Sequence, residues 1–125
     1  VMKKYTQKEF NKFEIVDGYR QCPQGDYSLI NKFGDNNAFY DFNEFGDSNE
    51  FGDFNEFGID NEFGLLNEFG DGNGFGDGNT FGDCNTFGDC NDFGDRNEFG
   101  DFNEFGIDNR FGDCNEFGDG NNPYA

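Results

Sequence analysis

Residues 51–70 read FGDFNEFGIDNEFGLLNEFG, and the same six-residue pattern, F-G-D-x-N-x, runs from Phe33 to Asn122. Phe recurs at every sixth position, and Asn follows at the fifth position of each hexad. Gly follows Phe in every hexad but one, and Asp stands third in every hexad but three. A period this strict is typical of a repeat architecture, in which each repeat stacks on its neighbours. We therefore expect the hexad, and not local helix propensity, to determine the fold.

Alternation within the hexad predicts which side chains point inward. Asn at position five and the Phe of the next hexad are separated by a single residue, so both lie on one face of a short strand and position six points outward. Gly and Asp at positions two and three predict a corner, because Gly tolerates positive φ and Asp can bond to backbone two residues further on. The sequence therefore predicts an all-β solenoid with inward ladders of Phe and of hydrogen-bonded Asn.

The segment before the repeat, residues 1–26, has a different composition. Its motif Thr6-Gln7-Lys8-Glu9 is a capping box, which predicts a short helix over about 7–13. A brief strand at 13–16, a turn at Asp17-Gly18 and a loop at 21–26 are expected to follow. We predict that this segment caps the open first coil of the stack.

The repeat begins one unit before its first Phe. Tyr27 and Asn31 match positions one and five, so Tyr27 is predicted to be the first ring of the ladder. The solenoid is then expected to comprise sixteen hexads over residues 27–122, followed by a tail at 123–125.

Position four bears on how many hexads make one coil. Every second hexad carries a mostly apolar set there: Ile30, Phe42, Phe54, Leu66, Gly78, Cys90, Phe102 and Cys114. A two-sided coil of two hexads, or a four-sided coil of four, would keep this set on its own edge, whereas a triangular coil of three hexads would mix it with the polar set. Residues 53–61 recur identically at 101–109, so duplication accounts for part of the pattern.

The phrase F-G-D-x-N-x resembles the hexapeptide repeat of left-handed β-helix proteins, in which an aliphatic residue followed by Gly begins each side of a triangular coil. It also resembles uncharacterised bacterial and phage proteins with tandem F-G-x-x-C/N-x hexads behind a short N-terminal segment. The resemblance implies triangular 18-residue coils. Because three Phe rings in one layer would crowd a triangle, two-sided 12-residue coils are slightly favoured.

The best-known enzymes of the hexapeptide class are acyltransferases, and the resemblance would imply a catalytic His, but this chain has no His. General acid–base catalysis needs carboxylates in unlike environments, and repeated Asp residues are equivalent. A thiol nucleophile at Cys84, Cys90 or Cys114 would lack a His base and would lie among carboxylates, which raise a thiol pKa. We therefore expect no enzyme activity, no catalytic residue and no cofactor.

The D-x-N spacing of the hexads is also used by calcium loops. Stacked Asp carboxylates would repel one another, and a divalent cation would relieve that repulsion. The weak calcium candidates are Asp77, Asp83, Asp89 and Asp95. The favoured alternative is that each Asp caps its own turn and is solvated, so no metal site is expected.

Negative charge is concentrated in the repeat. Residues 27–122 carry three basic and 23 acidic residues, a net charge of −20, whereas residues 1–26 carry five basic and four acidic residues. Such a surface predicts an acidic module that binds a protein partner with a basic surface. The module would mimic nucleic acid and would not bind nucleic acid itself. Acidic pentapeptide-repeat solenoids that mimic DNA provide an analogy. The alternative is that the charge only keeps a repetitive β protein soluble.

The apolar position-four residues form a second candidate surface. An interaction stripe is predicted from six of them: Phe42, Phe54, Leu66, Cys90, Phe102 and Cys114. If they share one edge, the edge is too apolar to remain in water, and the chain would be a structural protein that self-associates into a dimer or fibre. The other interpretation folds each ring over the corner of its own coil.

The sequence also bears on location. It has no apolar run long enough to span a membrane and no secretory signal pattern, so no membrane partner is expected. The four Cys are irregularly spaced, which favours free thiols and a cytoplasmic location.

Overall fold

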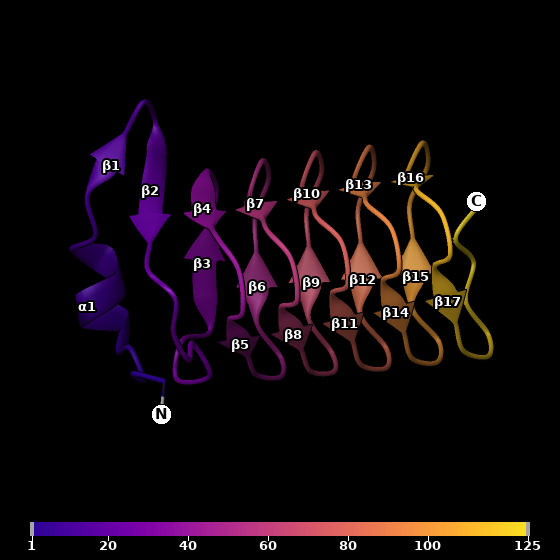
Figure 1. The fold of residues 1–125 in the computed structure, drawn as a ribbon, viewed down its shortest axis with the longest axis horizontal. Coiled ribbons are helices and arrows are strands. Elements are labelled where there is room, and N and C mark those ends of the chain that lie inside the picture. The colour runs from indigo at the N-terminus through magenta and orange to yellow at the C-terminus, as the bar shows by residue number, and fades with distance from the viewer. Residues whose placement is uncertain (1, 125) are drawn as a thin grey trace.

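The computed structural model, which describes residues 2–124, confirms an all-β solenoid of about five coils behind an N-terminal segment (Figure 1). That segment holds helix α1 (Gln7–Asn11) and the antiparallel strands β1 (Ile15–Val16) and β2 (Tyr19–Cys22). From β3 onward, each strand pairs in parallel with the strand three places away in the chain.

Three sheets form the sides of the solenoid, and we name them faces 1, 2 and 3 in chain order. Face 1 comprises β3 (Lys32–Gly34), β6 (Glu50–Phe51), β9 (Glu68–Phe69), β12 (Thr86–Phe87) and β15 (Glu104–Phe105). Face 2 continues from β1 and β2 through β4 (Asn37–Phe39), β7 (Glu56–Phe57), β10 (Gly74–Phe75), β13 (Asp92–Phe93) and β16 (Arg110–Phe111). Face 3 comprises β5 (Glu44–Phe45), β8 (Glu62–Phe63), β11 (Thr80–Phe81), β14 (Glu98–Phe99) and β17 (Glu116–Phe117).

One coil contains three hexads, so the preference for two-sided 12-residue coils is wrong. Phe75 pairs with Phe57 on one side and with Phe93 on the other, which is a period of three hexads. The rings do not overfill the triangle because neighbours within a coil meet edge to face. The ring of Phe75 lies 5.4 Å from Phe69 at 77° and 5.3 Å from Phe81 at 79°, measured between centroids.

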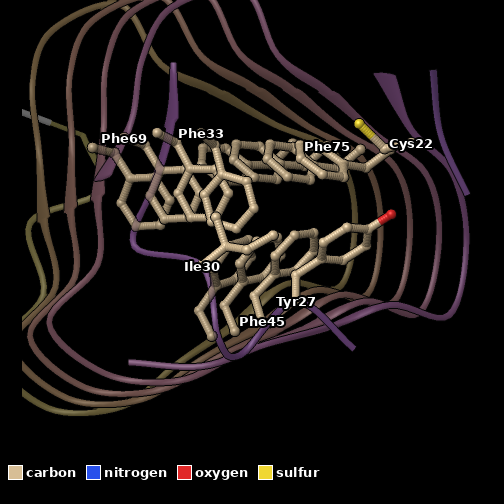
Figure 2. Packing of buried hydrophobic residues seen from close by; sticks show 14 of the residues in the cluster. Cys22, Tyr27, Ile30, Phe33, Phe45, Phe69 and Phe75 are labelled. Atoms are coloured by element: carbon tan, nitrogen blue, oxygen red, sulfur yellow. The ribbon is translucent and has the colours of Figure 1, made fainter. Parts of the chain in front are cut away.

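Along the axis, each ring stacks on the equivalent ring of the next coil (Figure 2). Phe69 and Phe87, for example, have centroids 4.8 Å apart and planes 4° from parallel. Tyr27 is the first ring that the repeat contributes to its column, as predicted, and it stacks on Phe45 at 5.5 Å. Tyr5 of the N-terminal segment precedes it in the column and stacks on Tyr27 at 5.2 Å. Offset-stacked and edge-to-face contacts are both favourable for aromatic rings, at about 0.5–1.5 kcal/mol per pair beyond area burial. The core is therefore three columns of stacked rings that also contact one another.

Asn at position five joins consecutive coils, as the predicted Asn ladder requires. Most of its hydrogen bonds run from the side chain to backbone groups of the preceding coil, and not from one Asn side chain to the next. From Asn55 to Asn121, each side-chain Oδ1 accepts the amide N–H of the Asn in the preceding coil at 2.7–2.9 Å. In most of them Nδ2 donates to a position-two carbonyl of the same preceding coil, as Asn79 does to Gly58 at 3.0 Å. The side chains from Asn37 to Asn103 are buried, so these bonds satisfy backbone groups that water does not reach.

The N-terminal segment covers the first coil. Phe10 of α1 is buried and its ring contacts the first ring that the repeat contributes to each column, Tyr27, Phe33 and Phe39. The predicted capping box is present, since the Thr6 hydroxyl accepts the Glu9 amide and the Glu9 carboxylate accepts the Thr6 amide.

Three boundaries in this segment differ from the prediction. The helix ends at Asn11 and not at residue 13, and strand β1 begins at Ile15 and not at residue 13. Strand β2 reaches Cys22, inside the predicted loop, because residues 20–22 pair in parallel with residues 37–39 of β4. This pairing makes the N-terminal hairpin a continuation of face 2.

Candidate interaction surface

The three corners carry the large exposed apolar side chains of the solenoid. We name them by the faces they join: corner 1–2, corner 2–3 and corner 3–1. At every hexad from Asn36 to Gly120 the position-four residue has a positive φ, between 55° and 72°. This left-handed conformation turns the chain through the corner and leaves the large side chains at this position exposed, with 51% of Phe42 and 61% of Phe102 accessible to solvent.

Position-two glycines have a role that differs from the one expected of them. The positive φ predicted for them occurs at Gly34 but not at the later position-two glycines, since position four supplies it instead. They are required for close approach between coils. A Cβ built on Gly82 would lie 2.8 Å from the carbonyl oxygen of Gly64 in the preceding coil, a distance that backbone atoms cannot easily relieve.

Position-three aspartates also act between coils. The prediction that each Asp caps its own turn is wrong for the repeat: Asp71 Oδ1 accepts the amide of Asp89 in the next coil at 2.7 Å. Ten such bonds, of 2.7–2.9 Å, run from Asp35 to Asp101. Because coils stack closely, the amide of the next coil is within reach of the carboxylate, and the bond holds one carboxylate oxygen in a fixed position on the surface.

The four calcium candidates do not form one site. Asp77 and Asp95 lie at corner 2–3, Asp83 at corner 3–1 and Asp89 at corner 1–2, because equivalent residues of consecutive hexads lie on successive corners of a three-hexad coil. Each uses Oδ1 to accept an amide of the next coil. Among residues 2–124, no group of three or more His, Cys, Asp or Glu side chains is placed to hold a metal ion.

The six residues of the predicted interaction stripe do not share an edge. Phe42 and Cys114 lie at corner 2–3, Phe54 and Cys90 at corner 1–2, and Leu66 and Phe102 at corner 3–1. The physical reason is the coil length: residues two hexads apart would share an edge only in a coil of two or four hexads. Some rings instead cover the adjoining coil, as Phe54 does over Gly72, where an added Cβ would meet the ring at 2.8 Å.

A different apolar strip is present at corner 3–1. Leu66, Cys84 and Phe102 occupy position four in three successive coils, and Leu65 precedes them at position three. All four are exposed, and we call this set the 3–1 ridge. Leu65 and Cys84 were missed from the sequence because the spacing that unites the ridge is three hexads, which had not been favoured.

Acidic side chains surround the solenoid on every side. The outer row of face 3 consists of Glu44, Glu62, Thr80, Glu98 and Glu116 and contains no basic residue. Each basic residue of the repeat is paired with a carboxylate: Lys32 with Glu50 at 3.8 Å, Arg96 with Asp77 at 3.6 Å, and Arg110 with Asp92 at 3.1 Å. Exposed pairs of this kind stabilise little, but they mask the few positive charges that interrupt the acidic surface.

The four thiols fall into two classes. Cys84, Cys90 and Cys114 are exposed and lie at three different corners, so the structure does not bring them together. Cys22, the last residue of β2, is buried in the hydrophobic core, and burial raises the pKa of its thiol to about 12.

In the part of the chain that the structure describes, no helix is long and apolar enough to cross a membrane.

Comparisons with known proteins place no further constraint on this surface. Neither a protein-family model, nor a curated protein, nor a solved structure matches the chain.

Proposed function

We propose that this protein is a non-enzymatic interaction module that occupies the basic groove of a DNA- or RNA-binding protein in place of nucleic acid. The observation that carries the proposal is charge density. Residues 27–122 hold a net charge of −20 in about five coils, whose ring columns repeat every 4.8 Å. The axis is therefore roughly 25 Å long, with about one net charge per 1.3 Å against about 1.7 Å in duplex DNA.

The arrangement of the charges supports the same proposal. Position-six carboxylates stand in axial rows, in which neighbours such as Glu98 and Glu116 are one coil apart. Position-three carboxylates accept hydrogen bonds from backbone amides of the next coil, as Asp53 does from Asp71. Fixed charges lose little conformational freedom when a partner binds, which favours affinity. A rod of this length would replace about seven base pairs, at roughly 3.4 Å per base pair.

Displacement of DNA tests the proposal directly. A labelled duplex is bound to a core histone dimer and, separately, to a bacterial nucleoid protein, and the solenoid is titrated in while anisotropy is followed. We expect displacement, with an apparent affinity that falls at least about tenfold between about 50 and 200 mM salt. The solenoid alone is expected to leave the free duplex unbound. Failure to displace DNA from either protein at the lower salt concentration would contradict the proposal.

Two controls separate mimicry from simple attraction between opposite charges. A variant with Glu44, Glu62, Glu98 and Glu116 changed to Gln keeps the fold, since these side chains are exposed, and it should displace DNA more weakly. Polyglutamate of the same net charge has no fixed spacing. If polyglutamate displaces the duplex as well as the folded chain does, the geometry of the solenoid is not what the partner recognises.

A structural, self-assembling role is the second candidate. It is favoured by the large apolar rings exposed at the corners, such as Phe42 and Phe102. A second copy that covered these rings would remove that apolar surface from water. Light scattering at low and high salt distinguishes the candidates, because a salt-indifferent dimer or filament supports assembly and a monomer supports the mimic.

A further inference from the structure

The 3–1 ridge is an exposed apolar strip that continues through three successive coils. Leu66 is 53% exposed and Phe102 is 61% exposed, and the exposed Cys84 lies in the coil between them. At the other two corners, the run of large apolar residues at position four is broken in the next coil. At corner 2–3 Phe42 is followed by Asp60, and at corner 1–2 Phe54 is followed by Gly72.

The fold itself does not favour bulky residues on this ridge. Leu66, Cys84 and Phe102 have φ of 59°, 60° and 58°, a conformation that costs residues other than Gly, Asn and Asp about 1–2 kcal/mol. Position four has the same conformation at the other corners, where it holds residues that tolerate positive φ, such as Asn36 and Asp60, and one as bulky as Phe42. Leu66 and Phe102 therefore add strain while most of their surface stays exposed, so the stability of the fold does not account for them.

Carboxylates border the ridge on both sides. Glu62 and Glu98 of the face 3 row lie before it in the chain, and the face 1 row, with Glu68 and Glu104, lies after it. A second copy would bring the same negative charges against these rows. The ridge is therefore complementary to a partner that is apolar along its centre and cationic at its margins.

We propose that the 3–1 ridge binds a basic amphipathic helix of the partner protein, laid along the solenoid axis. The helix would rest its apolar stripe on Leu66 and Phe102 and direct its Lys and Arg to Glu62 and Glu98. Coils repeat every 4.8 Å at the stacked rings, and an α-helix advances about 5.4 Å per turn. Over four coils, the positions of the helical turns and of the coils differ by only about 2 Å along the axis. Long cationic side chains can span that difference.

This inference rests on the proposed function, because it names the element of the basic partner that the solenoid contacts. It adds that binding depends on apolar contact at one corner as well as on charge.

A synthetic helix provides the probe. An 18-residue peptide with Leu on one stripe and Lys on both flanks is titrated into the full-length protein and followed by anisotropy, with a scrambled peptide of equal composition as control. The ridge variant carries Leu66→Asn and Phe102→Asn, and the matched variant carries Phe42→Asn and Phe54→Asn at the other corners. Asn accepts positive φ, so both variants should melt at or above the parent temperature.

We expect the ridge variant to bind the amphipathic peptide at least about tenfold more weakly than the parent, from the apolar area it no longer buries. The matched variant should bind within about twofold of the parent, and the scrambled peptide should bind weakly to all three. Equal losses in the two variants, no loss in the ridge variant, or tight binding of the scrambled peptide would each overturn the assignment.

The two proposals fail in different ways. If the parent displaces DNA and the ridge variant does so equally well, the ridge is not the contact and the proposed function stands. If the parent binds the amphipathic peptide through the ridge but displaces DNA from neither test protein, the nucleic-acid mimic is wrong and the helix site stands.

Discussion

Replacing Asn79 by Ala removes one inter-coil clamp from the middle of the solenoid. The Asn79 side chain is fully buried. Its Oδ1 accepts the amide of Asn61 at 2.8 Å, and its Nδ2 donates to the carbonyls of Gly58 at 3.0 Å and Gly76 at 3.1 Å. Ala keeps the backbone conformation but supplies neither group. The Asn61 amide is then left buried without its acceptor.

The magnitude follows from those contacts. A buried donor left unpaired costs about 1–3 kcal/mol. The small cavity and the lost donor bonds of the amide add to this, so Asn79→Ala should lower the free energy of unfolding by about 2–4 kcal/mol. The adjacent Thr80 is exposed, and Thr80→Ala should stay within about 0.5 kcal/mol of the parent.

Urea unfolding followed by circular dichroism measures the loss, and hydrogen exchange locates it. Because each repeat contacts only its neighbours, protection should fall most at the Asn61 amide and its neighbouring coil. A loss below about 1 kcal/mol, or an Asn61 amide as protected as in the parent, would refute the claim that Asn side chains satisfy the backbone of the preceding coil.

Four further outcomes are expected. Phe69→Asp should abolish folding, because Phe69 is 3% exposed and an unpaired charge would enter the ring columns; a variant that melts within about a degree of the parent would contradict this. Gly82→Ala should destabilise by about 1–3 kcal/mol in thermal unfolding, whereas Gly74→Ala, whose Cβ meets nothing within 4 Å, should not destabilise comparably. A thiol reagent at mildly alkaline pH should modify the three exposed Cys rapidly and Cys22 only after unfolding, since burial raises the pKa of that thiol to about 12; four fast thiols would be the contrary result. Melting with calcium and with chelator should give the same midpoint, and a calcium-dependent rise would reopen the Asp corners as a metal site.

Much of the fold could be predicted because the hexad contains local rules that hold in any solenoid. Alternation placed Phe inside and position six outside whatever the coil length. The same rule identified Tyr27 as the first ring of the repeat, and the Thr6–Glu9 capping box located the start of α1. These features depend on residues two or three apart, so a single hexad or a single helical turn already contains the information.

The corners were predicted less well because their close contacts and hydrogen bonds join residues in different coils. Position-two Gly and position-three Asp are typical turn residues, and local reasoning assigned them local roles. In the structure Gly82 is needed because Gly64 lies against it, and Asp71 bonds to the amide of Asp89. Both contacts join residues three hexads apart, a separation at which neither residue type has a sequence signature.

Residue order alone is sufficient to specify the period, the inward ladders of Phe and Asn, the acidic exterior and the placement of a distinct segment before the repeat. The number of hexads that close one coil is settled only in three dimensions. Each hexad satisfies the same local rules in a two-sided or a three-sided coil, so the choice depends on how rings from distant hexads pack. Three Phe rings fit edge to face around the axis. That closure scatters the predicted stripe over three corners and brings Leu66, Cys84 and Phe102 into line.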